Sequence, residues 1–216
     1  MPGLFVTFEG GEGSGKSTQV ARLAARLRAL GIDPLITREP GGTPVAEGVR
    51  ALLLDPDRRP VPVAEALLME ASRAQLVATV LKPALDAGRV CICDRYADST
   101  LAYQGAGRGI DSALLEQWNH AATQGLRPDV TLLFDVDPTL GLRRRQEAPG
   151  ATNRLDREPA DFHERVRARY LELARSEPAR WVVFDASLHP DELEAQVWEA
   201  VIARLPAEAR PSARRA

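Results

Sequence analysis

Cysteine and histidine are scarce, since the 216 residues include two cysteines and three histidines. Cys91 and Cys93 lie one residue apart in an apolar run, and alternate residues of a strand face opposite sides of a sheet. These two are therefore not expected to form a disulfide with each other. A metal site built on Cys-x-Cys needs further cysteine or histidine ligands, and the histidines lie elsewhere in the sequence. We expect two small buried residues in a protein of the reducing cytoplasm.

Long apolar runs and net charge are also lacking. The apolar runs stay well below the roughly 20 residues of a membrane-spanning helix. Met1 to Gly3 lead into a strand pattern without a signal peptide. The net charge of -2 predicts no attraction to nucleic acid or to an anionic membrane. Any affinity for phosphate must therefore come from arginines that are placed locally.

Strand and helix patterns alternate along a chain whose length predicts one domain, over residues 1–206. The predicted strands span 4–8, 33–37, 89–93, 130–134 and 181–184. The predicted helices begin near 16, 44, 63, 111, 138, 160 and 190, and the helix from 63 runs to about 87 with Pro83 as the expected site of a kink. This alternation predicts an α/β fold, with a five-stranded parallel sheet and helices on both faces. The segment that continues to Gly109 has a mixed pattern and is assigned to no helix or strand, and the tail, 207–216, is predicted to be disordered.

A glycine-rich motif follows the first predicted strand. Gly10 to Ser17 fit G-x-x-x-x-G-K-[ST], and a helix pattern opens near Lys16, which is the strand, loop and helix context of a phosphate-binding loop. Glycines let consecutive backbone N–H groups turn towards an anion, and the helix N-terminus adds its positive end. We expect Lys16 to reach the β- and γ-phosphates of ATP and the Ser17 hydroxyl to hold Mg²⁺. The predicted ATP-binding residues are Gly10, Gly11, Glu12, Gly13, Ser14, Gly15, Lys16, Ser17 and Thr18.

Charged residues follow the second and third predicted strands. In parallel sheets of this kind, ligands bind outside the carboxyl ends of the strands. Arg38 follows one strand and Asp94 and Arg95 the other, so an arginine fixed there can hold a phosphate with two hydrogen bonds. Asp94 can orient that arginine or hold a water on Mg²⁺, and an Arg–Asp pair that only closes a strand end is the alternative. Arg50 adds a cation on the next helix, where a solvated surface position is the simpler interpretation.

An arginine-dense segment with a Pro-Gly break, about 143–158, separates two predicted helices. A charge run of this kind is usually a solvated helix end. A closing lid is the second interpretation, because phosphoryl transfer needs positive charge at the migrating group while water is excluded. Gly13 favours the lid, since the phosphate-binding loop itself contains no arginine. The candidate lid arginines are Arg143, Arg144, Arg145, Arg154 and Arg157.

Five stretches together resemble the thymidylate kinase family, the dTMP kinases of bacteria. They are Glu9–Thr18, Thr37–Thr43, Asp94–Tyr96, Ser99 with Ala102–Gly105, and Arg167–Tyr170. The loop and the Asp-Arg pair alone fit several nucleotide kinases, and the other stretches narrow the match. The resemblance implies a P-loop NTPase fold with a lid, and transfer of the γ-phosphoryl group of MgATP to dTMP, giving dTDP for dTTP synthesis. It also implies a cytoplasmic homodimer.

The resemblance further implies the catalytic and metal residues. The catalytic set is Lys16, Arg95 and Glu12 together with the lid arginines, and Glu12 would face the sugar 3′-hydroxyl. The metal set is Ser17 and Asp94. Catalysis would rest on positioning and charge stabilisation, without a covalent enzyme intermediate.

The implied dTMP-binding residues extend this set. Met69 stands where the family usually has a phenylalanine that stacks on thymine, and Arg73, on the same helix face, would hydrogen-bond the thymine edge. Without the resemblance we would expect Met69 in the core and Arg73 on the surface. Tyr103 would crowd the 2′ position of the sugar and disfavour ribonucleotides. The implied set is Glu12, Arg38, Arg50, Met69, Arg73, Arg95, Ser99, Tyr103 and Gln104.

Two alternatives stay open from the sequence. One is a kinase for another nucleoside monophosphate, which a substrate screen with dCMP and UMP separates from a dTMP kinase. The other is a nucleotide-switch module that binds ATP and signals through a partner, and it would transfer no phosphoryl group to a mononucleotide. Arg38, Arg73 and Arg95 argue against the switch, because such a module has no use for a second anion pocket.

Overall fold

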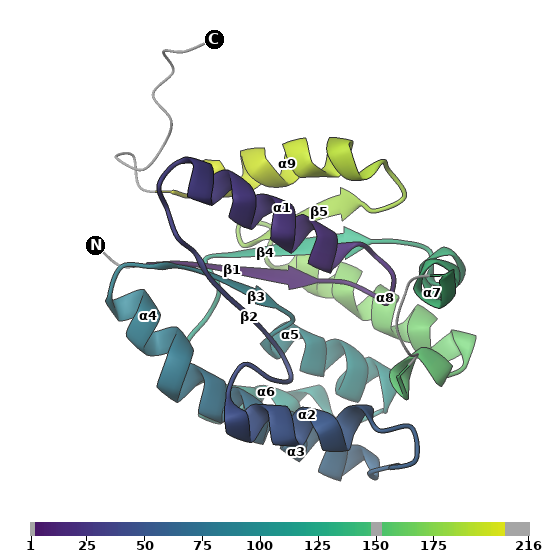
Figure 1. Ribbon diagram of the computed structural model, residues 1–216. Helices are drawn as coiled ribbons and strands as arrows, with labels where there is room; N and C mark the ends of the chain where they lie inside the picture. The colour runs from purple at the N-terminus through teal and green to yellow at the C-terminus, as the bar shows by residue number, and fades with distance from the viewer. Residues whose placement is uncertain (1–2, 148–152, 206–216) are drawn as a thin grey trace.

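Five parallel strands form one sheet at the centre of the computed structural model, which describes residues 3–147 and 153–205 (Figure 1). The strands are β1 (Leu4–Glu9), β2 (Leu35–Arg38), β3 (Val90–Asp94), β4 (Val130–Asp135) and β5 (Trp181–Asp185). Their order across the sheet is β2-β3-β1-β4-β5, and each hydrogen-bonded pair of neighbours is parallel. The predicted α/β architecture is confirmed. The predicted tail, 207–216, and part of the predicted lid, 148–152, lie outside the described residues.

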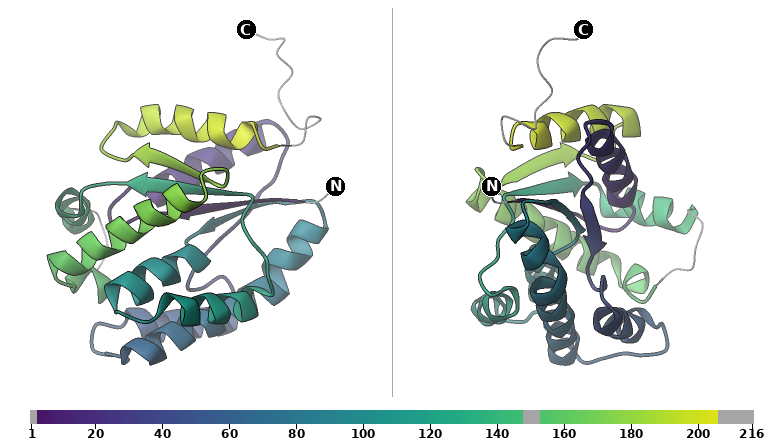
Figure 2. Two further views of the ribbon diagram at one scale, coloured as in Figure 1. Left: turned by 180° about the vertical axis from the view of Figure 1, so that it is seen from behind. Right: turned by 60° about the vertical axis from the view of Figure 1, so that its left-hand side comes forward.

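Helices cover both faces of the sheet (Figures 1 and 2). One face is covered by α1 (Lys16–Ala29) and α9 (Pro190–Ile202). The other helical elements are α2 (Pro44–Leu54), α3 (Pro62–Leu76), η1 (Val77–Leu81), α4 (Lys82–Asp86), α5 (Ala97–Thr100), η2 (Leu101–Gly107), α6 (Ser112–Thr123), α7 (Pro138–Glu147), η3 (Leu155–Arg157) and α8 (Ala160–Ser176). Residues of α3, η1, α4, η2, α6 and α8 build the cores on the opposite face. Across residues 3–147 and 153–205, every helix is too short or too polar to cross a bilayer.

The side chains of β1, the middle strand, alternate between the two faces. Leu4, Val6 and Phe8 join the core under α1 and α9, while Phe5 joins a cluster on the opposite face. The same alternation directs Glu9 to the face of Phe5, where its side chain is fully buried. The last residue of the central strand is therefore a carboxylic acid enclosed by protein.

The helix predicted at 63–87 is confirmed as a continuous helical segment made of α3, a π-helical turn (η1) and α4. Pro83 has no backbone N–H to donate, and its ring crowds the preceding turn of an α-helix. The wider π turn directly before it relieves this crowding. The expected irregularity therefore takes the form of a π turn, within which the Thr79 hydroxyl donates to the Gln75 carbonyl (2.7 Å).

Segment 97–109, for which the sequence pattern is mixed, is mostly helical, because it forms α5 and a second π-helical stretch, η2. At its start the Tyr96 N–H donates to the Glu9 carboxyl group (2.8 Å). At its end Gly107 lies so close to Phe162 of α8 that a Cβ would be 2.5 Å from the ring. The local pattern carries little helix signal, because the glycine-rich stretch has low helix propensity and these contacts come from distant parts of the chain.

The two cysteines lie on β3, and both are buried and free. Burial raises the pKa of the Cys91 thiol to about 11, so this thiol stays protonated at neutral pH. The Cys93 thiol donates to the backbone carbonyl of Arg95 (3.0 Å). The prediction of small buried strand residues is confirmed.

Candidate active site

A cavity of about 400 Å³ opens at the carboxyl ends of β1, β2 and β3. Its walls come from the loops after β1 and β2, the end of β3, α3, η2 and the two ends of the predicted lid. The predicted site residues that line it are Glu12, Gly13, Ser14, Gly15, Lys16, Ser17, Thr18, Arg38, Arg50, Met69, Asp94, Arg95, Ser99, Tyr103, Gln104, Arg145 and Arg154. Those that lie outside its lining are Gly10, Gly11, Arg73, Arg143, Arg144 and Arg157.

The loop after β1 wraps around Lys16. The Lys16 ammonium donates to the carbonyls of Gly10 (3.0 Å) and Gly11 (2.7 Å) and to the Ser14 hydroxyl (3.1 Å). Positive φ angles, which glycine adopts readily, occur at Gly10 (136°), Gly13 (64°) and Gly15 (86°). Burial lowers the pKa of Lys16 to about 8, so most of the ammonium is charged at pH 7. The loop thus holds a buried cation beside the N-terminus of α1, an arrangement suited to phosphate.

The same loop touches α7, the helix that begins the predicted lid. A Cβ at Gly13 would overlap the backbone carbonyl of Gly141, and a Cβ at Gly141 would overlap the carbonyl of Glu12. The two backbones are therefore in direct contact, which only glycine at both positions allows. Gly13 lets α7 pack against the phosphate-binding loop itself.

Arg95 lies in the turn after β3 with a φ of 72°, a left-handed conformation that costs energy for any residue other than glycine. Its backbone N–H donates to the Phe8 carbonyl (2.9 Å). Its guanidinium donates from Nη2 to Glu12 (2.8 Å) and lies over the Tyr103 ring, 4.8 Å from the ring centroid. The surroundings hold this conformation in place, and the result is a guanidinium fixed in direction at the cavity wall.

Glu12 is the acidic partner that Arg95 and Tyr103 share. The Tyr103 hydroxyl donates to the Oε1 atom that also accepts from Arg95 (2.9 Å). Burial acts to raise the pKa of Glu12, but the Arg95 and Lys16 charges hold it below its ordinary value. The carboxylate is therefore ionised at neutral pH and offers an acceptor between two cations.

Ser17 and Asp94, the predicted metal residues, are adjacent, because the Ser17 hydroxyl donates to Asp94 Oδ2 (3.0 Å). Among the described residues, no group of three or more histidine, cysteine or acidic side chains could hold a metal ion. Mg²⁺ prefers oxygen ligands, keeps several waters and usually binds through one or two protein oxygens plus substrate phosphates. A hydroxyl beside a carboxylate, next to a phosphate-binding loop, fits that donor set.

Two further arginines bring positive charge to the cavity. Arg38 donates from Nη2 to Glu47 of α2 (3.0 Å), and Arg50 donates from Nη1 to the Pro40 carbonyl (2.8 Å). Burial, followed by the Arg38 charge, lowers the pKa of Arg50. Arg50, for which a solvated position is the simpler interpretation of the sequence, in fact lines the cavity.

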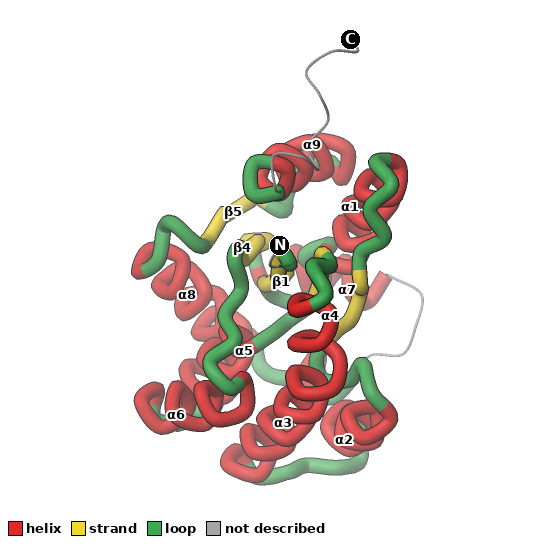
Figure 3. The backbone as a smooth tube through the Cα atoms, turned by 90° about the vertical axis from the view of Figure 1, so that its left-hand side faces the viewer, coloured by secondary structure: helices red, strands yellow, loops and turns green. Residues whose placement is uncertain are grey.

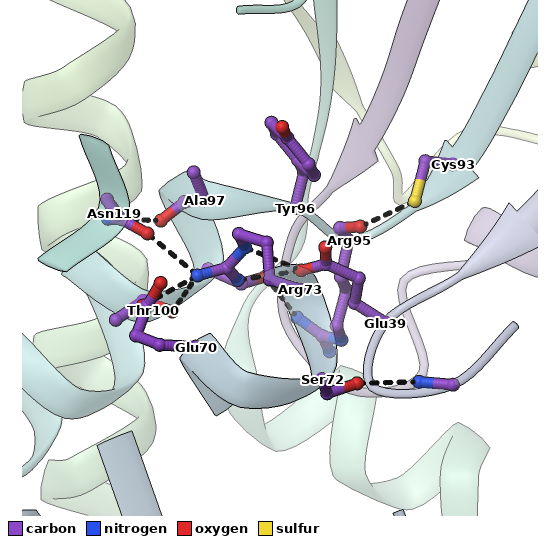
Figure 4. A network of polar contacts seen from close by, with 12 residues as sticks. Glu39, Glu70, Ser72, Arg73, Cys93, Arg95, Tyr96, Ala97, Thr100 and Asn119 are labelled. Carbon is purple, nitrogen blue, oxygen red and sulfur yellow. Dashed lines mark hydrogen bonds and ion pairs between the residues drawn. The ribbon is translucent and has the colours of Figure 1, made fainter. Parts of the chain in front are cut away.

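Arg73 is fully buried rather than exposed, and Figure 4 shows it enclosed by polar partners. Its guanidinium donates from Nε (2.9 Å) and Nη2 (2.6 Å) to Glu39, and from Nη1 to Glu70 (2.7 Å). The same Nη1 donates to Thr100 (3.0 Å) and Asn119 (2.7 Å). Arg73 meets the cavity through Glu39, which lines the wall. Its assignment to the thymine edge stays a prediction.

The remaining predicted dTMP residues differ in whether their polar atoms already have hydrogen-bond partners within the protein. Met69 lines the cavity as a nearly buried side chain. Gln104 donates from Nε2 to Glu65 (2.8 Å), and its buried carbonyl oxygen has no hydrogen-bond partner within the described ranges. The Ser99 hydroxyl, in contrast, donates to Glu9 (2.6 Å). Ser99 is therefore engaged with the protein itself.

Two of the candidate lid arginines face the cavity. Arg154 lines it and donates to the buried Glu65 (2.6 Å) and to the Leu53 carbonyl (3.2 Å). Arg145 also lines it and forms an ion pair with Asp156 (3.4 Å). Both are thus held on the inner side of the predicted lid.

The other three candidate arginines point elsewhere. Arg144 donates to the carbonyl of Ala186 (2.7 Å), beyond the end of β5. Arg143 and Arg157 are exposed and do not line the cavity. In the described structure the arginines of the charge run are therefore divided between the cavity, the loop after β5 and the exposed surface.

Three buried polar residues of the site were missed from the sequence. Glu65 accepts from Gln104 and Arg154 beside the cavity, and Glu9 and Tyr170 hydrogen-bond each other behind Arg95 (2.8 Å). Glu9 and Tyr170 lie within stretches that resemble the family. The resemblance therefore marked these two positions but implied no function for them. Glu65 lies in an amphipathic helix start, where an acidic residue is ordinary.

Similar proteins identify the family of this chain. A family model described as thymidylate kinase matches residues 8–197. The chain is 54% identical over 202 residues to a thymidylate kinase of Deinococcus radiodurans, with 94% of this chain and 98% of that protein covered. It is 51% identical over 197 residues to one of Thermomicrobium roseum, with 91% and 93% covered.

A solved structure agrees with these relatives. The thymidylate kinase from Ehrlichia chaffeensis is 32% identical and superimposes with a TM-score of 0.76, covering 93% of this chain and 99% of that one. The five-stranded parallel sheet, in the order β2-β3-β1-β4-β5, is therefore that of the P-loop kinase fold of thymidylate kinases. This chain belongs to the thymidylate kinase family.

Proposed function

We propose how the cavity divides between the two substrates of the reaction that family membership gives this chain. The chain is an ATP-dependent dTMP kinase, which phosphorylates dTMP to dTDP. The observation that carries the division is that one cavity contains both the phosphate-binding loop and, beside it, the Arg95–Glu12 pair (2.8 Å). The loop provides for the phosphates of one nucleotide, and a second fixed guanidinium provides for the phosphate of another.

The donor side is the phosphate-binding loop with the N-terminus of α1. Lys16 would stabilise negative charge on the β- and γ-phosphates of ATP. Ser17 and Asp94 would hold Mg²⁺ together with phosphate oxygens and water, and the bound ion neutralises charge on those phosphates. The protein then contributes position and charge rather than a covalent intermediate.

The acceptor side centres on Arg95. Arg95, with Arg38 and Arg50 on the neighbouring wall, would hold the phosphate of dTMP. Glu12 would accept a hydrogen bond from the sugar 3′-hydroxyl. Tyr103 lies on the Arg95 guanidinium and would crowd the 2′ position, which disfavours ribonucleotides.

The base would lie against Met69 and Gln104. The Met69 thioether can cover one face of the thymine ring. The carbonyl oxygen of Gln104, unpaired among the described residues, suits the N3–H of thymine, which cytosine lacks. Arg73 keeps its predicted assignment to the thymine edge, and its position behind Glu39 makes that contact the least direct of the set.

Arg145 and Arg154 are our assignment for the lid arginines that act on the transferring phosphate, because these two line the cavity. Arg143, Arg144 and Arg157 are weaker candidates for this role, because they do not line the cavity. The segment of about 143–158 would then be the lid of a single catalytic domain over residues 1–206.

We also propose a homodimer formed through α2, α3 and α6. These helices pack side by side, α2 on α3 and α3 on α6 (Figure 3). The exposed large hydrophobic side chains on or beside them are Val45, Leu52, Val61, Val63, Leu67 and Leu114. Clustered exposed apolar side chains mark an interaction surface. The proposed location is the cytoplasm, which agrees with two buried, free cysteines.

A coupled assay of ADP release tests the donor side. Lys16→Ala should lower kcat at least about a hundredfold, because the ammonium stabilises charge on the migrating phosphoryl group. Activity with dTMP should exceed that with dCMP and UMP. Near-normal turnover of the variant, with its fold verified by circular dichroism, would contradict the assignment of the loop.

The same assay tests the acceptor side. Arg95→Ala should raise KM for dTMP far more than KM for ATP, because Arg95 holds the acceptor phosphate. The matched control is Arg175→Ala, which removes an exposed arginine near the end of α8 and should change neither constant. The opposite pattern, with KM for ATP rising, places Arg95 on the donor side and makes the division wrong.

A further inference from the structure

Glu9 is a fully buried acid to which the preceding assignment gives no role. Its Oε1 accepts the backbone N–H of Tyr96 (2.8 Å), and its Oε2 accepts the hydroxyls of Ser99 (2.6 Å) and Tyr170 (2.8 Å). These contacts join the end of β1 to α5 and α8. Residues from three distant parts of the sequence therefore converge on one carboxyl group.

The two hydroxyls connect Glu9 to Arg95. The oxygens of Ser99 and Tyr170 are 2.8 Å apart. Arg95 Nη1 donates to both of them, at 3.4 Å and 3.3 Å respectively. Both hydroxyl-bearing side chains are buried, while Arg95 and Ser99 also line the cavity.

The direction of the hydroxyl hydrogens follows from the charges on either side. An ionised carboxylate only accepts hydrogen bonds, and a guanidinium only donates them. Because Ser99 and Tyr170 lie between these two groups, each must point its hydrogen at Glu9 and its lone pairs at Arg95. A protonated Glu9 reverses one of these bonds: Oε1 still faces an N–H, so the acidic hydrogen must lie on Oε2 and donate to a hydroxyl. That hydroxyl then turns its own hydrogen away from Glu9.

We propose that Glu9 is a positioning residue for the phosphate of dTMP, because it orients the Ser99 and Tyr170 hydroxyls that hold Arg95. The inference deepens the proposed function and rests on Arg95 holding the acceptor phosphate. Glu12 contacts Nη2 of Arg95, and the hydroxyl pair contacts Nη1. The hydroxyl pair thus adds a second hydrogen-bonded constraint to those of Glu12 and the Tyr103 ring. Two parallel hydrogen bonds to a phosphate require such a fixed plane.

Protonation of Glu9 falls in an accessible pH range. Burial, followed by the Asp98 charge, raises the pKa of Glu9 to about 7. The charged and titratable groups that act on it or respond to it are Lys16 of α1, Glu39 after β2, Cys93 of β3, Arg95, Asp98 of α5 and Tyr170 of α8. Above pH 7 the carboxylate orients both hydroxyls, and below it the protonated form does not. KM for dTMP should therefore rise as the pH falls.

Tyr170→Phe is the first test, made in the full-length enzyme. It keeps the ring but removes one acceptor of Arg95, so KM for dTMP should rise roughly threefold to tenfold while kcat and KM for ATP stay within about twofold. The matched control is Tyr96→Phe, which removes a hydroxyl that donates to the Leu126 carbonyl (3.2 Å) rather than towards Arg95. It should leave KM for dTMP unchanged.

Glu9→Gln is the second test and adds a pH profile. Its amide would donate to the hydroxyls, so KM for dTMP should rise at least as far as in Tyr170→Phe. Between roughly pH 6 and pH 8, the wild-type KM should fall with rising pH, and the variant should lose the part of this change due to Glu9. The phosphate of dTMP, with a second pKa of about 6, titrates in both proteins. Lys16 and Glu39, with pKa values of about 8 and about 7, respond to Glu9 in the same range. The difference between the two profiles therefore reports Glu9 together with its effect on these two neighbours.

The results separate positioning from packing. A loss of thermal stability with unchanged KM for dTMP in Tyr170→Phe and Glu9→Gln would overturn the proposal. If Glu9→Gln does not fold, Tyr170→Phe decides alone. Arg95→Ala, which removes the cation, examines the function on which the inference rests. An unchanged KM for dTMP there means that Arg95 does not hold the acceptor. If KM for dTMP rises in the Arg95 variant but stays unchanged in Tyr170→Phe, only the role of Glu9 is overturned.

Discussion

Met69 and Arg73 are separated by one turn of α3, yet one lines the cavity and the other lies behind its wall. A thioether covers less of a thymine ring than a phenyl group and has more rotamers to restrict on binding. Aromatic pairs contribute about 0.5–1.5 kcal/mol beyond buried area, and sulfur–aromatic contacts about 0.3–1.5 kcal/mol. Because the ranges overlap, Met69 should affect how tightly the base binds more than which base is chosen.

Met69→Phe should accordingly tighten dTMP by less than about tenfold, which corresponds to roughly 1.4 kcal/mol. The preference for dTMP over dCMP should hardly change, since in the proposed function polar groups recognise the base edge. Calorimetric affinities for both nucleotides provide the measurement. Leu68→Phe enlarges the neighbouring residue, which does not line the cavity, and serves as the control. No effect of Met69→Phe on either nucleotide would make Met69 a packing residue, and a large shift in base preference would mean that stacking selects thymine.

Arg73 shows why the hydrogen-bond partners of a residue are harder to predict than the region of the fold in which it lies. Its acceptors Glu39, Thr100 and Asn119 lie 34, 27 and 46 residues away in sequence, and local patterns carry no record of such pairs. A buried charge without partners costs several kcal/mol, so the surface was the reasonable expectation. The motifs predicted which residues gather at the cavity, because parallel strand ends lie along one edge. They did not predict that the side chains of Ser99 and Arg73 form their hydrogen bonds with other residues of the protein.

At the scale of the elements, α7 and the phosphate-binding loop make direct backbone contact through Gly13 and Gly141. Gly141→Ala would gain helix propensity, worth about 1 kcal/mol, but its Cβ would overlap the Glu12 carbonyl. The loop must then shift, so KM for ATP should rise about tenfold or more, even if the protein remains folded. Steady-state kinetics with varied ATP measures this.

The matched control for that prediction is Gly48→Ala on α2. A Cβ at Gly48 meets no atom within 4 Å, so the substitution should stabilise the protein by about 0.5–1 kcal/mol and leave KM for ATP unchanged. Thermal unfolding of both variants completes the comparison. An unchanged KM for ATP in Gly141→Ala would mean that the loop tolerates displacement. The contact between the two glycines would then have no effect on ATP binding.

Elements were predictable from sequence where local preference and burial agree. The apolar strands and the helices that follow caps or prolines agree with the structure, as in α2, where Thr43 accepts from the Ala46 N–H (3.1 Å) and Pro44 opens the helix. The stretch 97–107 shows the opposite case, because two glycines weaken the local preference and contacts with Glu9 and Phe162 decide the conformation. A helix that depends on tertiary contacts leaves little trace in the local sequence.

At the scale of the whole molecule, the surface of α2, α3 and α6 is the proposed contact between two subunits. Leu67 of α3 has 48% of its surface exposed there, and Val183 of β5, away from these helices, has 47%. Leu67→Glu should shift the protein from dimer to monomer, because a buried unpaired carboxylate opposes association. Val183→Glu, with matched exposure and charge, should not. Sedimentation velocity at several concentrations measures both, and equal behaviour of the two variants would contradict the interface.

The two glycines that bring the phosphate-binding loop against α7 also limit how related sequences can diverge. An arginine at position 13 would place a permanent cation beside the migrating phosphate, but its Cβ would occupy the space of the Gly141 carbonyl. That substitution is open only to a lineage in which α7 has already moved, so positions 13 and 141 should change together across an alignment. In the proposed function the lid arginines then provide this charge, because the spacing of two backbones excludes an arginine from position 13 of the loop.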